Sequence, residues 1–119
     1  MGLRVIPTAV HGIIDYASSG ALFTTPTLLG LNDMPPSARS LRLASGGAVA
    51  SSLLTDYELG VVKLIPMPVH LTLDVMSGAL LAASPWLFGF AKDNGPRYWL
   101  PHALMGTTEV LIALMSKTR

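Results

Sequence analysis

The sequence predicts an all-α fold: a four-transmembrane-helix bundle built from two parallel tandem helical-hairpin repeats. Three observations support this prediction. The chain contains an internal duplication, it carries unusually little charge, and four apolar segments are separated by stretches that hold most of the charged residues.

The duplication pairs segment 4–31 with segment 63–90 at a shift of 59 positions. Ten of the 28 paired positions are identical, and the identities include histidine, aspartate and proline, which seldom recur by chance within apolar segments. Self-similarity at a fixed spacing indicates a repeated structural unit. We therefore expect a single membrane domain over residues 1–119, with repeat 1 at about 4–58 and repeat 2 at about 63–117.

Composition narrows the class of protein. Half of the residues are hydrophobic and 13% are charged, whereas a soluble domain has roughly 25% charged residues. The net charge of +1 gives no reason to expect nucleic acid as a partner. Because the chain has no cysteine, disulfides, thiolate zinc sites and iron–sulfur clusters are excluded.

The apolar segments cover residues 7–24, 40–54, 66–83 and 98–115. A helix of about 17 residues spans about 26 Å, the short end of what crosses a bilayer. We expect a multi-pass integral membrane protein surrounded by lipid, with both termini on the same side; a soluble four-helix protein is the alternative. Orientation is not predicted, because four basic residues fall on each side: Arg4, Lys63, Lys117 and Arg119 against Arg39, Arg42, Lys92 and Arg97.

Proline residues mark both ends of the first and third helices. Pro7 and Pro66 suit the first helical turn, where a missing N–H leaves no partner unsatisfied. A hydroxyl residue followed by Pro26 or Pro85 resembles the N-cap and first position of a new helix. We expect the long helices to end there, followed by short turns closed by glycine at positions 30 and 89. A proline kink within one longer helix is the alternative.

The second and fourth helices are weaker copies of each other. A shift of 60 positions aligns Asp33 with Asp93 and Gly46 with Gly106. The second helix is rich in small residues, which allow close backbone approach in lipid, and its small-residue face is the candidate partner surface. Between the repeats, Thr followed by Glu three residues later, at positions 55 and 58, predicts a capped short helix. Five aromatic residues fit a belt at one membrane face: Trp86, Phe88, Phe90, Tyr98 and Trp99.

A polar stripe recurs in both repeats. The spacing of four and three residues puts each stripe on one helix face, and a two-fold axis along the membrane normal would bring the two stripes together. An ionisable group at the membrane centre costs roughly 2.5–3.5 kcal/mol and needs a partner. We expect an inter-repeat polar site made of His11, Asp15, Ser18, His70, Asp74 and Ser77.

Three interpretations of this site stay open. In the structural one, each histidine donates to its own aspartate at i+4 and the pairs hold the hairpins together. In the second, a divalent transition metal such as zinc or iron is bound by His11, Asp15, His70 and Asp74. In the third, His11 and His70 are axial ligands of a haem or a magnesium-bearing pigment. A proton or ion pathway is a further alternative.

Glu109 is the other charge expected inside the membrane. We expect it near mid-depth, either close to Asp15 or Asp74, or paired with Arg42 or a threonine. His102 shares its face and is expected at the interface rather than as a ligand.

The sequence contains no nucleophile elbow, no phosphate-binding glycine loop and no HExxH motif. We therefore expect a non-enzymatic accessory or structural subunit that packs within a larger membrane assembly, its partner being a membrane protein or a second copy. A metal-, haem- or pigment-binding membrane protein and a small ion or proton carrier are the alternatives.

The segment from His70 to Asp74, continuing to Ser84-Pro85-Trp86, resembles the SPW-repeat integral membrane family. The resemblance covers essentially the whole chain and implies a four-helix membrane domain. Repeat 1 departs from the pattern because a threonine stands where Trp86 stands in repeat 2. The resemblance implies no activity and no catalytic residue.

Overall fold

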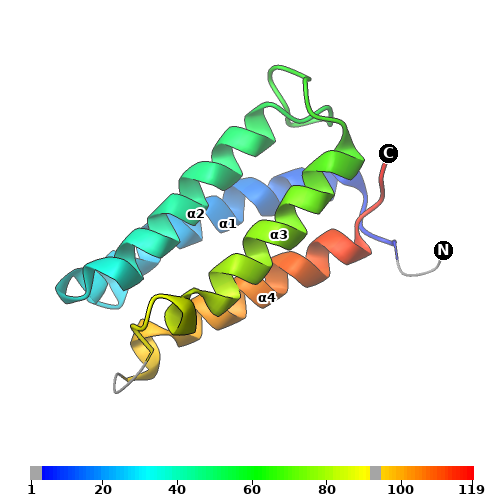
Figure 1. Cartoon of the computed structure of the whole chain (residues 1–119). Helices are drawn as coiled ribbons and strands as arrows, with labels where there is room; N and C mark the ends of the chain where they lie inside the picture. Colours follow the sequence, from blue (N-terminus) through cyan, green and yellow to red (C-terminus); the bar gives the residue numbers. More distant parts are fainter. Residues whose placement is uncertain (1–3, 92–94) are drawn as a thin grey trace.

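The computed structural model describes residues 4–91 and 95–119; Lys92 and Asp93, which entered the sequence arguments, lie outside this range. The described residues form an all-helical fold (Figure 1). Its helices are α1 (Thr8–Leu28), α2 (Pro35–Leu53), α3 (Met67–Leu87) and α4 (Leu100–Met115), with 3-10 turns at Leu31–Asp33 and Pro96–Tyr98. The expected all-α class and helix number are confirmed.

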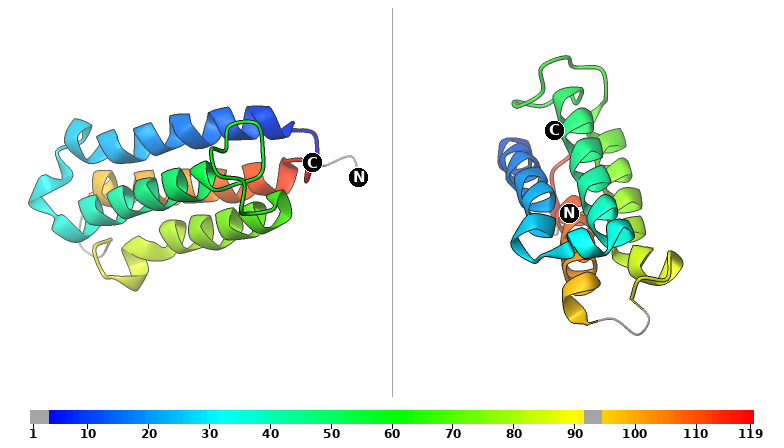
Figure 2. Two further views of the ribbon diagram at one scale, coloured as in Figure 1. Left: turned by 90° about the horizontal axis from the view of Figure 1, so that it is seen from above. Right: turned by 90° about the vertical axis from the view of Figure 1, so that its left-hand side faces the viewer.

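The helices form two hairpins, α1 with α2 and α3 with α4 (Figure 1). Helices α1 and α3 run in the same direction, and the chain at residues 4 and 119 lies at one end of the bundle (Figure 2). In the part of the chain that is described, the extended pairings are two isolated bridges, Ile6 with Ser116 and Thr55 with Ile65.

These two bridges are counterparts. Ile65 is the duplicate of Ile6, so the partners Thr55 and Ser116 occupy equivalent places at the ends of α2 and α4. They are 61 positions apart, not 60. Gly106 therefore corresponds in space to Ser45 rather than to Gly46, the residue with which the sequence comparison aligned it.

Helices α1 and α3 do not end before their late prolines. They continue through Pro26 and Pro85, so the expected stop was wrong and a longer helix forms instead. Pro85 has no N–H to donate to the carbonyl of Leu81, and the Ser84 hydroxyl donates to that oxygen at 2.7 Å. The glycines just beyond the two helices have positive φ, as the expected turns require: 66° at position 30 and 76° at position 89.

The connector between α2 and α3 forms no capped helix, so that expectation was also wrong. Glu58 accepts instead from the Thr8 hydroxyl, at 2.8 and 3.0 Å. The pKa of Glu58 lies below its usual value because its own backbone N–H and Thr8 donate to the carboxylate. A Cβ at Gly12 would lie 2.8 Å from Leu59 and 3.1 Å from Tyr57. The connector thus packs directly on the first turns of α1.

Polar groups fill much of the interior, while large apolar side chains cover the outside. Buried polar residues include all three histidines and Asp74. Exposed apolar side chains occur on every helix, among them Ile13, Phe23, Leu43, Leu80, Trp86, Leu104 and Leu111. Within the described chain one helix, α3, is long and apolar enough to cross a membrane, and α4 is a shorter apolar helix.

Candidate functional site

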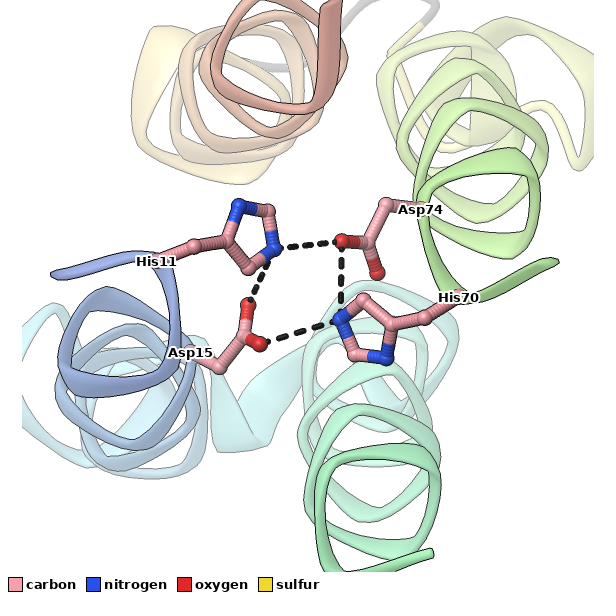
Figure 3. Close-up of side chains that lie close together, drawn as sticks. All are labelled: His11, Asp15, His70 and Asp74. Atoms are coloured by element: carbon pink, nitrogen blue, oxygen red, sulfur yellow. Dashed lines mark hydrogen bonds and ion pairs between the residues drawn. The ribbon is translucent and has the colours of Figure 1, made fainter. Parts of the chain in front are cut away.

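Four side chains of the predicted polar site converge between α1 and α3 (Figure 3). His11 Nε2 lies 3.2 Å from Asp15 Oδ1 and 2.9 Å from Asp74 Oδ2. His70 Nε2 lies 3.0 Å from Asp15 Oδ2 and 3.1 Å from Asp74 Oδ2. We call these residues the His/Asp ring. Its bonds run within each helix and across the two repeats, so the convergence expected from the duplication is present.

The His/Asp ring is shielded from solvent. The side chains of His11 and His70 are 1% exposed, and those of Asp15 and Asp74 are 13% and 9% exposed. The two imidazole rings meet edge to face, with centroids 5.3 Å apart. Buried ionisable groups need compensating partners, and here each carboxylate meets both imidazoles.

A hydroxyl group orients each imidazole from its other side. His11 Nδ1 lies 2.6 Å from Ser116 Oγ, and His70 Nδ1 lies 2.6 Å from Thr55 Oγ1. Each hydroxyl already donates its own proton to the carbonyl four residues earlier in its helix, at 2.6 Å. Each hydroxyl oxygen therefore accepts from Nδ1–H, which assigns the Nδ1 proton on both histidines from the hydrogen-bond network.

This assignment leaves both Nε2 atoms facing carboxylates. A neutral imidazole protonated at Nδ1 presents a lone pair at Nε2, and a lone pair facing a carboxylate is repulsive. Two arrangements relieve this: Nε2 carries a second proton and donates to the aspartates, or a cation lies between the nitrogen and oxygen atoms. Both are compatible with the distances.

Tyr57 adds a further donor to the His/Asp ring. Its hydroxyl donates to Asp15 Oδ2 at 2.8 Å from the connector that covers α1. Burial raises the pKa of the Tyr57 phenol, so the phenol remains protonated. The ring is thus closed by the connector on the side where the chain termini lie.

The remaining predicted site residues lie beside the ring. Ser77 donates to Glu109 Oε1 at 2.7 Å. Ser18 is exposed and lines a cavity of about 180 Å³ together with Glu109, Asp15 and Asp74. Glu109 therefore lies near both aspartates, as one of the two expectations had it.

One alternative for Glu109, pairing with Arg42, was wrong. Arg42 does not pair with Glu109; it donates to Thr27 Oγ1 at 3.1 Å and to Asn32 Oδ1 at 3.3 Å. His102 is fully buried within the bundle, and its Nε2 lies 2.9 Å from the Ser37 carbonyl oxygen. Arg42 is held within its own hairpin, whereas His102 of α4 reaches across to α2 of the other hairpin, and a linear pattern reveals neither contact.

Two gaps flank the His/Asp ring, one between α1 and α4 and one between α2 and α3. The first is the cavity of about 180 Å³, and the second is a groove of about 560 Å³. Their lining residues correspond at the shifts that relate the repeats. The α2/α3 groove is larger because α2 contributes Ala44, Gly47 and Ala48 where α4 contributes Met105, Thr108 and Glu109.

Sequence reasoning missed Thr55, Tyr57 and Ser116. The signal available was a hydroxyl residue directly after the last apolar residues of each return helix. The shift of 60 positions used for these helices does not align Thr55 with Ser116, so the repetition was hidden. Tyr57 has no counterpart in the second repeat that the pattern would expose.

A family model described as the SPW repeat domain matches residues 9–116 of the chain. No curated protein and no solved structure matches it.

Proposed function

The chain belongs to the SPW repeat family, and we propose that it is a small integral membrane protein with four spans and both termini on one side, acting as a non-enzymatic accessory subunit of a larger membrane assembly. The observation that carries this proposal is the apolar exterior of the bundle around a partly polar interior. Large exposed apolar side chains surround an interior that holds histidine, serine and aspartate. Water would disfavour such an exterior, whereas lipid favours it.

The positions of the charged residues support four spans. The exposed charged residues named here lie in the connecting segments or near a helix start. Those at one end of the bundle come before α1, between α2 and α3, and after α4: Arg4, Asp56, Glu58, Lys63 and Lys117. Those at the other end lie in the turns that join α1 to α2 and α3 to α4, or just after them: Asp33, Arg39 and Arg97. The bundle measures 43 Å along its longest axis, and the hydrocarbon core of a bilayer is about 30 Å thick. Trp86 and Trp99, with rings 5.6 Å apart, lie near the second end, where aromatic anchors are favoured.

Cysteine labelling tests the four spans without background, because the chain has no native cysteine. Asp56→Cys and Lys117→Cys should react with an impermeant maleimide from one side of sealed vesicles. Arg39→Cys should react only from the other side. Reaction of all three from one side would contradict the topology.

The α2/α3 groove supports an accessory role. Small residues on one wall let the backbone of a partner helix approach closely, which is how helices associate in lipid. A photo-crosslinker attached at Gly47→Cys should capture a membrane-protein partner or a second copy in native membranes. The matched control is Thr107→Cys, exposed on α4. A subunit that stays monomeric and uncrosslinked at both positions would refute the accessory role.

An ion or proton carrier is the second candidate, favoured by the cavity in which Glu109 lies beside the two aspartates. Protonatable groups facing an internal cavity are typical of ion pathways. Proton flux in liposomes that falls with Glu109→Gln would support a carrier, while flux no greater than in empty liposomes would exclude it. The haem or pigment alternative is not favoured, because the imidazole centroids are 5.3 Å apart with both Nε2 atoms directed at carboxylates.

A further inference from the structure

We infer that the His/Asp ring is a closed four-ligand site for a divalent transition cation, with Zn²⁺ as the ion that fits its geometry best. The ligands are Nε2 of His11 and His70 and one carboxylate oxygen each of Asp15 and Asp74. This inference does not depend on the membrane topology, so either can fail without the other.

The spacing of the ligand atoms carries the first step. All four lie within 4.8 Å of one another. With Oδ2 as the ligand atom of both aspartates, three nitrogen–oxygen separations are short: His11 to Asp74 at 2.9 Å, His70 to Asp15 at 3.0 Å and His70 to Asp74 at 3.1 Å. Zinc bonds of about 2.0–2.1 Å in a tetrahedron place neighbouring ligand atoms about 3.3 Å apart. To accept a tetrahedral ion, the short nitrogen–oxygen contacts have to widen by a few tenths of an ångström, and any separation near the 4.8 Å limit has to shorten.

The outer partners carry the second step. A histidine that binds a metal through Nε2 usually donates its Nδ1–H to a fixed acceptor, and this hydrogen bond sets the orientation of the imidazole. Ser116 and Thr55 provide this acceptor for His11 and His70, and Tyr57 donates to Asp15. These contacts leave both Nε2 lone pairs directed at the centre of the His/Asp ring.

Charge balance is compatible with a bound divalent ion, as it is with the metal-free form in which two protons cancel the charge of the two carboxylates. Two carboxylates and two neutral imidazoles have a net charge of −2, which a divalent cation cancels. The buried site would then be neutral as a whole, and that is the condition for placing charged groups away from water. Because protein atoms fill all four positions, the ion would have a structural role and would join α1 to α3.

The test uses the full-length protein purified in mild detergent, stripped with a chelator and titrated with Zn²⁺. We expect one Zn²⁺ per chain, and an X-ray absorption spectrum with two imidazoles and only nitrogen and oxygen ligands. Asp74→Asn should weaken binding by more than about 100-fold, the upper range for loss of an outer partner alone. The control Asp33→Asn, an exposed carboxylate that pairs with Arg97 and lies outside both the ring and the cavity, should bind as the wild type does.

Failure of folded wild-type protein to bind Zn²⁺ would overturn the inference, and so would unchanged binding by Asp74→Asn. If Asp74→Asn does not fold, Co²⁺ binding by the wild-type protein tests the inference instead. An intense visible spectrum of tetrahedral Co²⁺ that is lost on adding Zn²⁺ supports the site. A weak octahedral spectrum, typical of surface binding, contradicts it.

Discussion

Thr55 and Ser116 determine what the His/Asp ring can do. Each hydroxyl donates to its own helix and accepts from an imidazole of the other repeat. Repeat 1 therefore orients His70, and the end of repeat 2 orients His11. The orientation of each imidazole therefore depends on a hydroxyl group from the other hairpin, so both hairpins must be folded for the ring to form.

The hydroxyl acceptors give the first prediction. Thr55→Val keeps the side-chain shape but leaves His70 Nδ1–H without an acceptor. Removing such a partner costs about 1–3 kcal/mol of unfolding free energy, and about 10–100-fold in metal affinity if the ring holds zinc. Unfolding in mixed micelles and Zn²⁺ titration measure the two effects.

Ser40→Ala is the matched control, because the Ser40 hydroxyl donates only to the Pro36 carbonyl at the start of its own helix. It should change unfolding free energy by no more than about 0.5 kcal/mol. Equal effects of Thr55→Val and Ser40→Ala would contradict the positioning role.

Proton release gives a second prediction at the same scale. Without metal, two protons lie in the contacts between the Nε2 atoms and the aspartates; with Zn²⁺, both Nε2 atoms are deprotonated. Each ion bound should therefore release about two protons. Calorimetric titration in two buffers of different ionisation enthalpy counts them, and release of none would show that the histidines are not ligands.

Much of the ring was predictable from the sequence, because histidine and aspartate recur with the same spacing in both repeats. Because polar side chains are disfavoured against lipid or an apolar core, the two copies of a polar stripe are expected to face each other. The outer partners of the ring were not predictable. Thr55 and Ser116 are equivalent only when the second and fourth helices are compared at a shift of 61 positions. That shift depends on loop lengths, which follow no periodic pattern.

At the scale of elements, the two hairpins pack differently. Gly78 and Gly106 bring α3 and α4 together: a Cβ at Gly106 would clash with the Gly78 carbonyl oxygen, and one at Gly78 would lie 2.7 Å from that of Gly106. The equivalent contact in the first hairpin is the hydrogen bond from Ser45 Oγ to the Ser19 carbonyl at 2.7 Å. The same helix pair is thus held by backbone contact in one repeat and by a hydroxyl in the other.

This difference gives a third prediction. Gly106→Ala should destabilise the bundle by about 1–3 kcal/mol, because the clash is with backbone that must separate to relieve it. Gly46→Ala, also within a helix, meets nothing within 4 Å and should stabilise by up to about 1 kcal/mol through helix propensity. Unfolding by denaturant in micelles compares the two variants, and an unchanged Gly106→Ala would refute the close packing.

The proline positions show where local rules fall short. The pair of a hydroxyl residue and a proline can begin a helix or lie near its end, and the sequence alone does not distinguish the two. The structure selects the second, because Ser84 supplies the hydrogen bond that Pro85 cannot make. The glycine turns beyond them were predicted well, since positive φ leaves little choice of residue.

At the scale of the whole molecule, two hairpins meet at the His/Asp ring and diverge elsewhere into the two flanking gaps. The groove between α2 and α3 is open because small side chains stand where α4 has large ones. A fourth prediction follows: Ala44→Met, which copies Met105, should be accommodated in the groove and block crosslinking from Gly47→Cys. Gel analysis of the crosslinked membranes measures this, and undiminished crosslinking would place the partner elsewhere.

The duplication predicted the helix directions and the meeting of the first and third helices. It did not predict the unequal gaps, which arise from positions where the repeats have diverged. Within the described residues, α3 alone is long and apolar enough to cross a membrane. Four spans therefore remain our proposal, for which the exposed apolar surface is the main support.

The most direct test of the account is a double-mutant cycle between His11 and Asp74, which belong to different repeats and lie 2.9 Å apart. Unfolding free energies of His11→Gln, Asp74→Asn and the double variant are measured in micelles with chelator present. We expect a coupling free energy of about 1–3 kcal/mol, because the two residues belong to one hydrogen-bond network. Effects that add within about 0.5 kcal/mol would contradict the claim that the His/Asp ring holds the two hairpins together.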